Sequence, residues 1–114
     1  MHLATIRVRD THVLSLALAR LDGRSGSALI DLVSAASESG ARDVVIDLHP
    51  ATVVDFAGAR ALRSASAQLP EGGRLFLAGL NGRARAVLRS HCAADRIRLI
   101  EWWTEAMEPL ADAA

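Results

Sequence analysis

The 114 residues are enough for one domain with a single hydrophobic core, and 51% of them are apolar, which excludes a disordered chain. The formal net charge is zero. This balance argues against nucleic acid or an anionic membrane surface as the main partner, because both attract a concentrated basic field. All 13 basic residues are arginine, so no lysine is present to form a Schiff base.

Cys92 is the single cysteine, so the chain has no intramolecular disulfide. Residues 1–10 carry charges at intervals and lack the apolar core of a signal peptide. No apolar run approaches the ~20 residues that span a bilayer. We therefore expect one cytoplasmic domain over residues 1–114, with no direct membrane insertion.

The chain begins with a predicted hairpin. Residues 3–9 alternate between small or apolar and polar side chains, as in a half-exposed strand. Asp10 and Thr11 are typical of a tight turn, and residues 12–18 follow as a second strand. The two strands are expected to pair antiparallel.

Residues 19–26 are rich in Gly and Asp, which predicts a loop. A helix follows, with Ser25 or Ser27 as the expected N-cap, and it ends near Ser39-Gly40.

The central stretch runs from a strand into a helix. Residues 44–48 form a short, β-branched apolar run that predicts a buried strand, and residues 49–54 form a loop. A helix over residues 56–69 is predicted from apolar side chains at spacings of three and four: Phe56, Ala59, Leu62, Ala65 and Leu69. The unpaired N–H groups at such a helix start favour negative charge, so we expect the functional site here.

The remaining chain supplies two more strands and two more helices. The strands are residues 74–78 and 97–100; one helix follows the turn at residues 79–82, and the last covers residues 104–113. The order is β-β-α-β-α-β-α-β-α. It predicts an α/β fold with a mixed, mostly parallel sheet and flanking helices, the first strand being antiparallel.

Phosphate chemistry finds little support in the sequence. A phospho-acceptor receiver domain needs a carboxylate cluster and a lysine, whereas Asp10 lies in a hairpin, Asp55 lies well past its strand, and lysine is absent. The glycine-rich segment 23–27 lacks both the Walker lysine and the glycine spacing of a dinucleotide loop. It is interpreted as a loop with a helix cap.

Metal and acyl-transfer sites are also absent from the pattern. The four histidines are scattered and are interpreted as surface residues: His2, His12, His49 and His91. No Gly-x-Ser-x-Gly elbow occurs. Asp22, Asp47 and Asp55 lie near strand ends, where carboxylates most often cap helices. We therefore expect no enzyme, catalytic residue, metal or cofactor.

Over nearly its full length the chain resembles a STAS domain, the fold of bacterial anti-sigma factor antagonists. The resemblance rests on the order and spacing of five segments: Leu21-Asp22, Val45-Ile46-Asp47-Leu48, Asp55-Phe56-Ala57-Gly58, residues 73–79 and residues 83–88. It implies a STAS-like α/β fold, which agrees with the element order that the periodicity predicts.

In that family the helix-opening motif is typically Asp-Ser-x-Gly, and an anti-sigma kinase phosphorylates the serine. The unphosphorylated domain binds the anti-sigma factor and frees the sigma factor, whereas phosphorylation adds negative charge and breaks the complex. The acid falls on Asp55 and the glycine on Gly58, but Phe56 occupies the serine position. The usual switch therefore has no hydroxyl here.

Phe56 has two interpretations. Pointing outward, it is a natural anchor for a protein interface; pointing inward, it packs with Leu62 and Val54. Following the resemblance, the expected partner-binding residues lie after the second and third strands and at helix starts: Asp22, Ser25, Thr52, Asp55, Phe56, Ala57, Gly58 and Asn81.

The first functional hypothesis is a non-enzymatic interaction module that binds a histidine-kinase-like anti-sigma factor. The second is a STAS scaffold subunit of a lipid-transport ABC system or a stressosome-like complex, which the neighbouring genes would distinguish. The third is a regulatory domain that binds a small ligand or nucleotide. The adjacent tryptophans Trp102-Trp103 can also mark the contact surface of a homodimer, although we expect at least one of the two to be buried.

Overall fold

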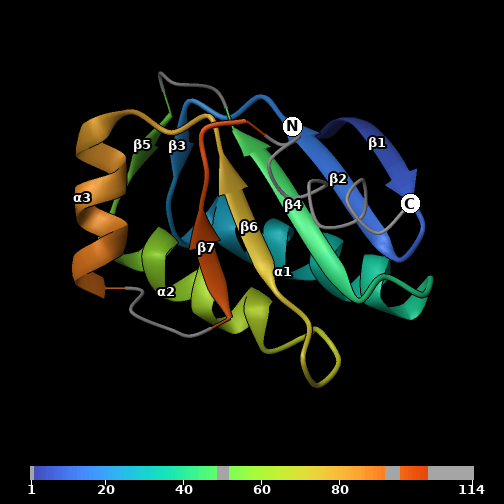
Figure 1. The fold of residues 1–114 in the computed structure, drawn as a ribbon. Helices are drawn as coiled ribbons and strands as arrows, with labels where there is room; N and C mark the ends of the chain where they lie inside the picture. Colours follow the sequence, from blue (N-terminus) through green and yellow to red (C-terminus); the bar gives the residue numbers. More distant parts are fainter. Residues whose placement is uncertain (1, 49–51, 92–95, 103–114) are drawn as a thin grey trace.

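Five strands form the central sheet of the computed structural model, which describes residues 2–48, 52–91 and 96–102 (Figure 1). In spatial order they are β1 (His2–Val8), β2 (Thr11–Leu16), β4 (Asp43–Leu48), β6 (Leu75–Ala78) and β7 (Ile97–Leu99). β1 pairs antiparallel with β2, and every other neighbouring pair is parallel. The predicted mixed, mostly parallel sheet is confirmed.

Strand β4 is the middle of the sheet and of the core. Ile46 lies opposite Leu14 on β2 and opposite Leu77 on β6, and all three belong to the main apolar cluster. Val45 points to the other face, where it packs in a smaller cluster with Val13 and Ala78. The strand is therefore buried on both faces, as expected for an apolar run in a parallel sheet.

Two helices cover the face of the sheet that carries the main cluster: α1 (Gly23–Glu38) and α2 (Phe56–Ser66). They approach closely because the contact is made by small residues. A Cβ built on Gly26 would lie only 2.4 Å from the Cβ of Ala61. Helix α3 (Gly82–His91) contacts α2 and lies at the far left of Figure 1.

A second, two-stranded sheet lies beside the start of these helices. It consists of β3 (Arg20–Leu21) and β5 (Val53–Val54), which pair in parallel with Arg20 opposite Val53. Both strands fall in segments predicted as loops. Strands of two residues show no apolar alternation, so periodicity alone does not reveal them.

Helix α1 begins earlier than predicted, and neither Ser25 nor Ser27 is its N-cap. Asp22 is extended (φ −127°, ψ −167°), and its carboxylate accepts hydrogen bonds from the backbone N–H groups of Arg24 and Ser25. The helix therefore includes half of the predicted loop, residues 23–26 of 19–26. Its C-cap, Ser39, agrees with the predicted end.

The structure corrects two further expectations, and others concern residues that it does not describe. Helix α2 ends at Ser66 rather than Leu69, although Leu69 is buried. His12 is buried rather than a surface residue, and burial together with the nearby Arg7 charge lowers its pKa. The predicted helix at residues 104–113 and Cys92 lie outside the described residues. Within the described segments, no helix has both the length and the apolarity needed to cross a bilayer.

Candidate functional site

The start of α2 is fixed by Asp55, as predicted. Asp55 is extended (φ −106°, ψ −179°), and its carboxylate accepts a hydrogen bond of 2.8 Å from the N–H of Gly58. Its own N–H donates to the carbonyl oxygen of Leu21 on β3, at 3.2 Å. The cap therefore stabilises the helix start and ties it to the small sheet.

Gly58 allows the first turn of α2 to press against β3. A Cβ at this position would lie 2.1 Å from the carbonyl oxygen of Leu21 and 2.6 Å from its carbonyl carbon. Only glycine fits without a shift of the backbone. Gly58 is buried, so it sets the position of the predicted surface without forming part of it.

Phe56 points outward, and the alternative of inward packing with Leu62 and Val54 is wrong. Its side chain is 63% exposed, whereas Ala59 and Leu62 on the buried face of α2 are fully covered. Val53 on β5 is also unusually exposed, at 51%. Two large apolar side chains thus lie three residues apart at the solvent-facing start of α2; we call them the Val53–Phe56 patch.

Thr52 lies inside the molecule instead. It is fully buried, and its hydroxyl donates a 2.7 Å hydrogen bond to the carbonyl oxygen of Leu18. The expectation that Thr52 contacts a partner is therefore wrong for this conformation. Its side chain joins the segment after β2 to the segment before β5.

Asp22 and Ser25 form a capping box at the start of α1. The Asp22 carboxylate accepts from the backbone of Ser25 at 3.1 Å, and the Ser25 hydroxyl oxygen accepts from the Asp22 N–H at 2.9 Å. Hydrogen bonds from the backbone of Ser25 are the main reason that the pKa of Asp22 is lowered. Both side chains are thus occupied in holding α1 in place.

The starts of α1 and α2 lie side by side. A Cβ on Gly23 would be 3.6 Å from the Cβ of Ala57, which is ordinary van der Waals contact. The structure thus brings the predicted residues Asp22 and Ser25 next to the Asp55–Gly58 turn.

Asp47 lies on β4, where burial raises its pKa.

Asn81 marks the third helix start near the site. Its side-chain oxygen accepts a 2.8 Å hydrogen bond from the N–H of Ala84, so it is the cap of α3. A small cleft of about 100 Å³ lies between this helix and β5, lined in part by Val53 and Asn81.

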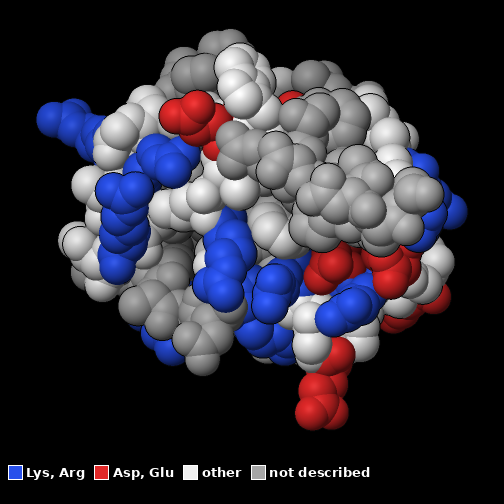
Figure 2. Space-filling model, viewed as in Figure 1, with Lys and Arg blue, Asp and Glu red and all other residues white. Residues whose placement is uncertain are grey.

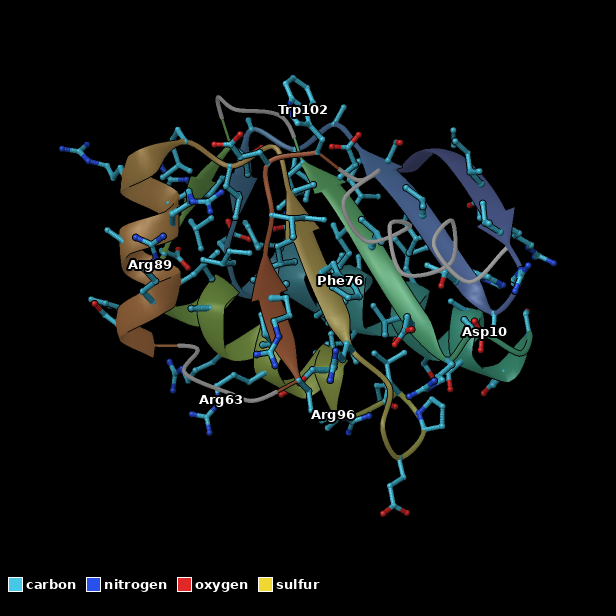
Figure 3. All side chains as sticks on the ribbon, viewed as in Figure 1. Asp10, Arg63, Phe76, Arg89, Arg96 and Trp102 are labelled. Carbon is cyan, nitrogen blue, oxygen red and sulfur yellow. The ribbon has the colours of Figure 1, made fainter. Side chains whose placement is uncertain are left out.

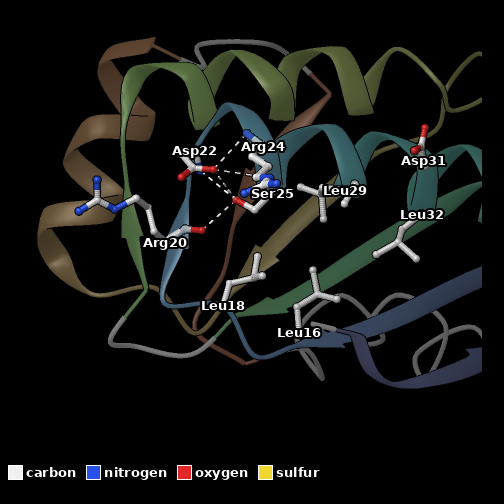
Figure 4. Close-up of a pocket in the computed structure, with 10 residues that line it drawn as sticks. Leu16, Leu18, Arg20, Asp22, Arg24, Ser25, Leu29, Asp31 and Leu32 are labelled. Atoms are coloured by element: carbon white, nitrogen blue, oxygen red, sulfur yellow. Dashed lines mark hydrogen bonds between the residues drawn. The ribbon is translucent and has the colours of Figure 1, made fainter.

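A larger groove next to the site was not predicted. It has a volume of about 700 Å³ and runs between α1 and the segment that leads from β2 to β3 (Figure 4). We call it the leucine groove, and its lining residues are Leu16, Leu18, Arg20, Asp22, Arg24, Ser25, Ala28, Leu29, Asp31 and Leu32. The sequence feature that could have indicated the groove is the number of apolar residues on α1. One of them, Leu32, is only partly buried although it packs against the core.

The two helices α2 and α3 are rich in arginine. Helices α2 and α3 together carry five arginines and no acidic residue within their bounds. Figure 2 shows arginine side chains on the α3 side and across the middle of this face, and Figure 3 labels Arg63 and Arg89 toward the α3 side. The whole chain has zero net charge, so this uneven distribution of charge between elements cannot be seen from the composition.

Two other expectations concern metals and self-association. In the described ranges, no group of three or more His, Cys, Asp or Glu side chains is placed to hold a metal ion. Trp102 is 70% exposed and lies at the upper edge of the view in Figure 3, whereas Trp103 is outside the described residues.

Comparison with known proteins gives one family and one fold. Residues 6–106 match the family model of the STAS domain. The solved structure of the anti-sigma factor antagonist SpoIIAA in its unphosphorylated form is similar, with a TM-score of 0.69 at 16% sequence identity. The match covers 98% of this chain and 97% of that one. Comparison with curated proteins finds no significant match.

Proposed function

The chain belongs to the STAS domain family, and from this premise we propose that it is a non-enzymatic interaction module that acts as an anti-sigma factor antagonist. It binds a histidine-kinase-like anti-sigma factor and thereby frees a sigma factor. The fold supports this role, because the similar SpoIIAA structure is that of an anti-sigma factor antagonist.

The observation that carries the proposal is the exposure of Phe56. An aromatic side chain that is 63% exposed at a rigid helix start is costly to leave in water and is a typical hot-spot residue of protein interfaces. Asp55 and Gly58 hold its backbone in one place. Val53 widens the apolar contact and lines a small cleft together with Asn81, while Asp22 and Ser25 lie at the adjoining start of α1.

Phe56 also determines how the module is regulated. Phenylalanine has no hydroxyl, so a kinase cannot add a phosphoryl group at this position. The complex is therefore not released by phosphorylation of residue 56. The complex therefore persists until the concentration of free partner falls or a change elsewhere in either protein lowers the affinity.

A pull-down against the histidine-kinase-like anti-sigma factors of the same genome tests the proposal. Wild-type protein is expected to capture one of them, with and without ATP. Phe56→Ser is expected to capture less, because the aromatic anchor is removed. Ile6→Ser is the matched control, since Ile6 is also an exposed apolar residue (42%) but lies on β1, at the opposite edge of the sheet from the helix α3 side.

Capture of no anti-sigma factor by wild type, or stronger capture by Phe56→Ser than by wild type, would contradict the proposal. Capture of a transporter permease or ATPase in its place would assign the chain to the scaffold role. Equal capture by wild type and Phe56→Ser would show that Phe56 does not contribute to the interface.

A further inference from the structure

The leucine groove is an apolar cavity with a charged end. Its floor is made by Leu16 and Leu29, which are almost fully buried, and its walls by the half-buried Leu18 and Leu32. Figure 4 shows these four side chains turned toward one shared space. Among the described residues that line the groove, the side chains are aliphatic or polar and none is aromatic. The groove fits aliphatic side chains.

The groove is continuous with the Val53–Phe56 patch. Arg20 lines the groove and is also the strand partner of Val53, so one exposed arginine links the two. The contact between Gly23 and Ala57 brings the first turns of α1 and α2 together at the same place. The two apolar features therefore form one extended surface that crosses β3.

The charges on this surface select the partner. Arg20 and Arg24 are exposed at the groove, and Arg60 is exposed one helical turn after Phe56. The neighbouring carboxylates, Asp22 and Asp55, are hydrogen-bonded to the backbone as helix caps. Asp31 on α1 is the exposed acid at the far end of the groove. The three arginines outnumber the two capping carboxylates, so the end that adjoins the patch carries a small excess of positive charge, which complements an acidic surface.

We propose that the leucine groove is the second half of the docking surface and that it receives an acidic, amphipathic segment of the partner protein. Leucine-like side chains of that segment enter the groove, its carboxylates pair with Arg20 and Arg24, and the partner's adjoining surface covers Phe56. This inference rests on the proposed function for the identity of the partner, but its chemistry is testable without it.

The test uses a labelled synthetic peptide in which leucine recurs every three or four positions and glutamate fills the rest. Fluorescence anisotropy measures its affinity for the whole chain, and amide NMR shifts locate the binding site. Wild type is expected to bind it, with shifts at Leu18, Arg24 and Leu32. A version with lysine in place of every glutamate is expected not to bind.

Two variants distinguish binding in the groove from non-specific hydrophobic binding. Ala28→Trp fills the groove from an exposed position on α1, and Arg24→Glu reverses the charge at the end of the groove. Each variant is expected to bind the peptide about tenfold more weakly than wild type, or weaker still. Arg9→Glu is the matched control, because Arg9 is an exposed arginine in the turn between β1 and β2, away from the groove. Circular dichroism verifies that each variant is folded.

The proposal is overturned if the acidic peptide does not bind, if Ala28→Trp binds it as tightly as wild type, or if the shifts lie elsewhere. A groove that takes dodecanoate but not the peptide is a lipid site and contradicts it as well. With a captured anti-sigma factor, equal binding by wild type, Ala28→Trp and Arg24→Glu refutes the groove alone. Failure to capture any such factor refutes the proposed function and leaves the peptide result to decide the groove.

Discussion

Phe56 and Gly58 show how two residues of one helix turn divide the work of a binding site. Gly58 is buried and sets the distance between α2 and β3, whereas Phe56 is exposed and carries the apolar surface. The exposed residue therefore depends on the buried one for its position. Substitution of Phe56 is expected to change binding with little effect on stability, and substitution of Gly58 the reverse.

Gly58→Ala is expected to lower the free energy of unfolding by about 2–3 kcal/mol, because the added methyl overlaps the carbonyl group of Leu21. Gly82→Ala is the matched control: no heavy atom lies within 4 Å of its added Cβ, and alanine favours a helix start by at most about 1 kcal/mol. Urea unfolding followed by circular dichroism measures both. A Gly58→Ala midpoint equal to that of Gly82→Ala would contradict the close contact.

Asp47→Asn is expected to raise the melting temperature at neutral pH. Burial raises the pKa of Asp47 above its ordinary value of 3.8, so the folded state holds the proton more tightly than the unfolded state does. The stability of the wild type therefore falls as the pH rises from 3.8 through the raised pKa. Melting curves of both proteins from pH 3 to pH 8 should converge at the acid end; a constant difference would argue against the charge as the cause.

At the scale of elements, the capping box of α1 makes the opposite pH dependence. The hydrogen bonds to Ser25 and Arg24 lower the pKa of Asp22, so its contribution to stability is complete above 3.8 and is lost as the pH falls through the lowered value. Asp22→Ala is therefore expected to melt below wild type at neutral pH and to approach it in strong acid. Asp22→Asn keeps an acceptor oxygen and should recover part of the loss; no recovery would show that capping is not the cause.

The sequence predicts those elements whose periodicity is long enough to be detected. The apolar run of β4 and the spacing of three between Ala59, Leu62 and Ala65 indicate a buried strand and an amphipathic helix, and the structure contains both. β3 and β5 are too short to show a period. Their pairing is set by tertiary contacts, such as the bond from the Asp55 N–H to Leu21.

The position of the candidate site follows from the sequence better than its shape does. Asp55 is predicted as the cap of α2 and is the cap, whereas α1 is capped by Asp22 instead of the predicted Ser25 or Ser27, because three candidate cap residues lie close together in that segment. The direction of Phe56 was open because an apolar residue at a helix start fits either face. The leucine groove joins β2 to α1, so its walls are separated in the sequence and meet only in the fold.

For the whole molecule, zero net charge hides a strong separation. Helices α2 and α3 carry five arginines and no acidic residue, Asp22 and Asp55 beside them are engaged as helix caps, and the exposed Asp31 lies at the far end of the leucine groove. A partner of opposite charge is therefore expected to associate faster at low ionic strength. Stopped-flow association with the captured anti-sigma factor should slow as salt rises, and less steeply for Arg60→Glu. An association rate independent of salt would contradict the proposed charge complementarity.

The central claim is that Phe56 anchors the partner. The most direct test is the dissociation constant of the captured anti-sigma factor for wild type, Phe56→Ala and Ile6→Ala, measured by surface plasmon resonance at one salt concentration. Loss of a hot-spot aromatic predicts about 30-fold weaker binding for Phe56→Ala, or roughly 2 kcal/mol, and less than about twofold for Ile6→Ala. Equal affinity of wild type and Phe56→Ala, with both folded, would contradict the account.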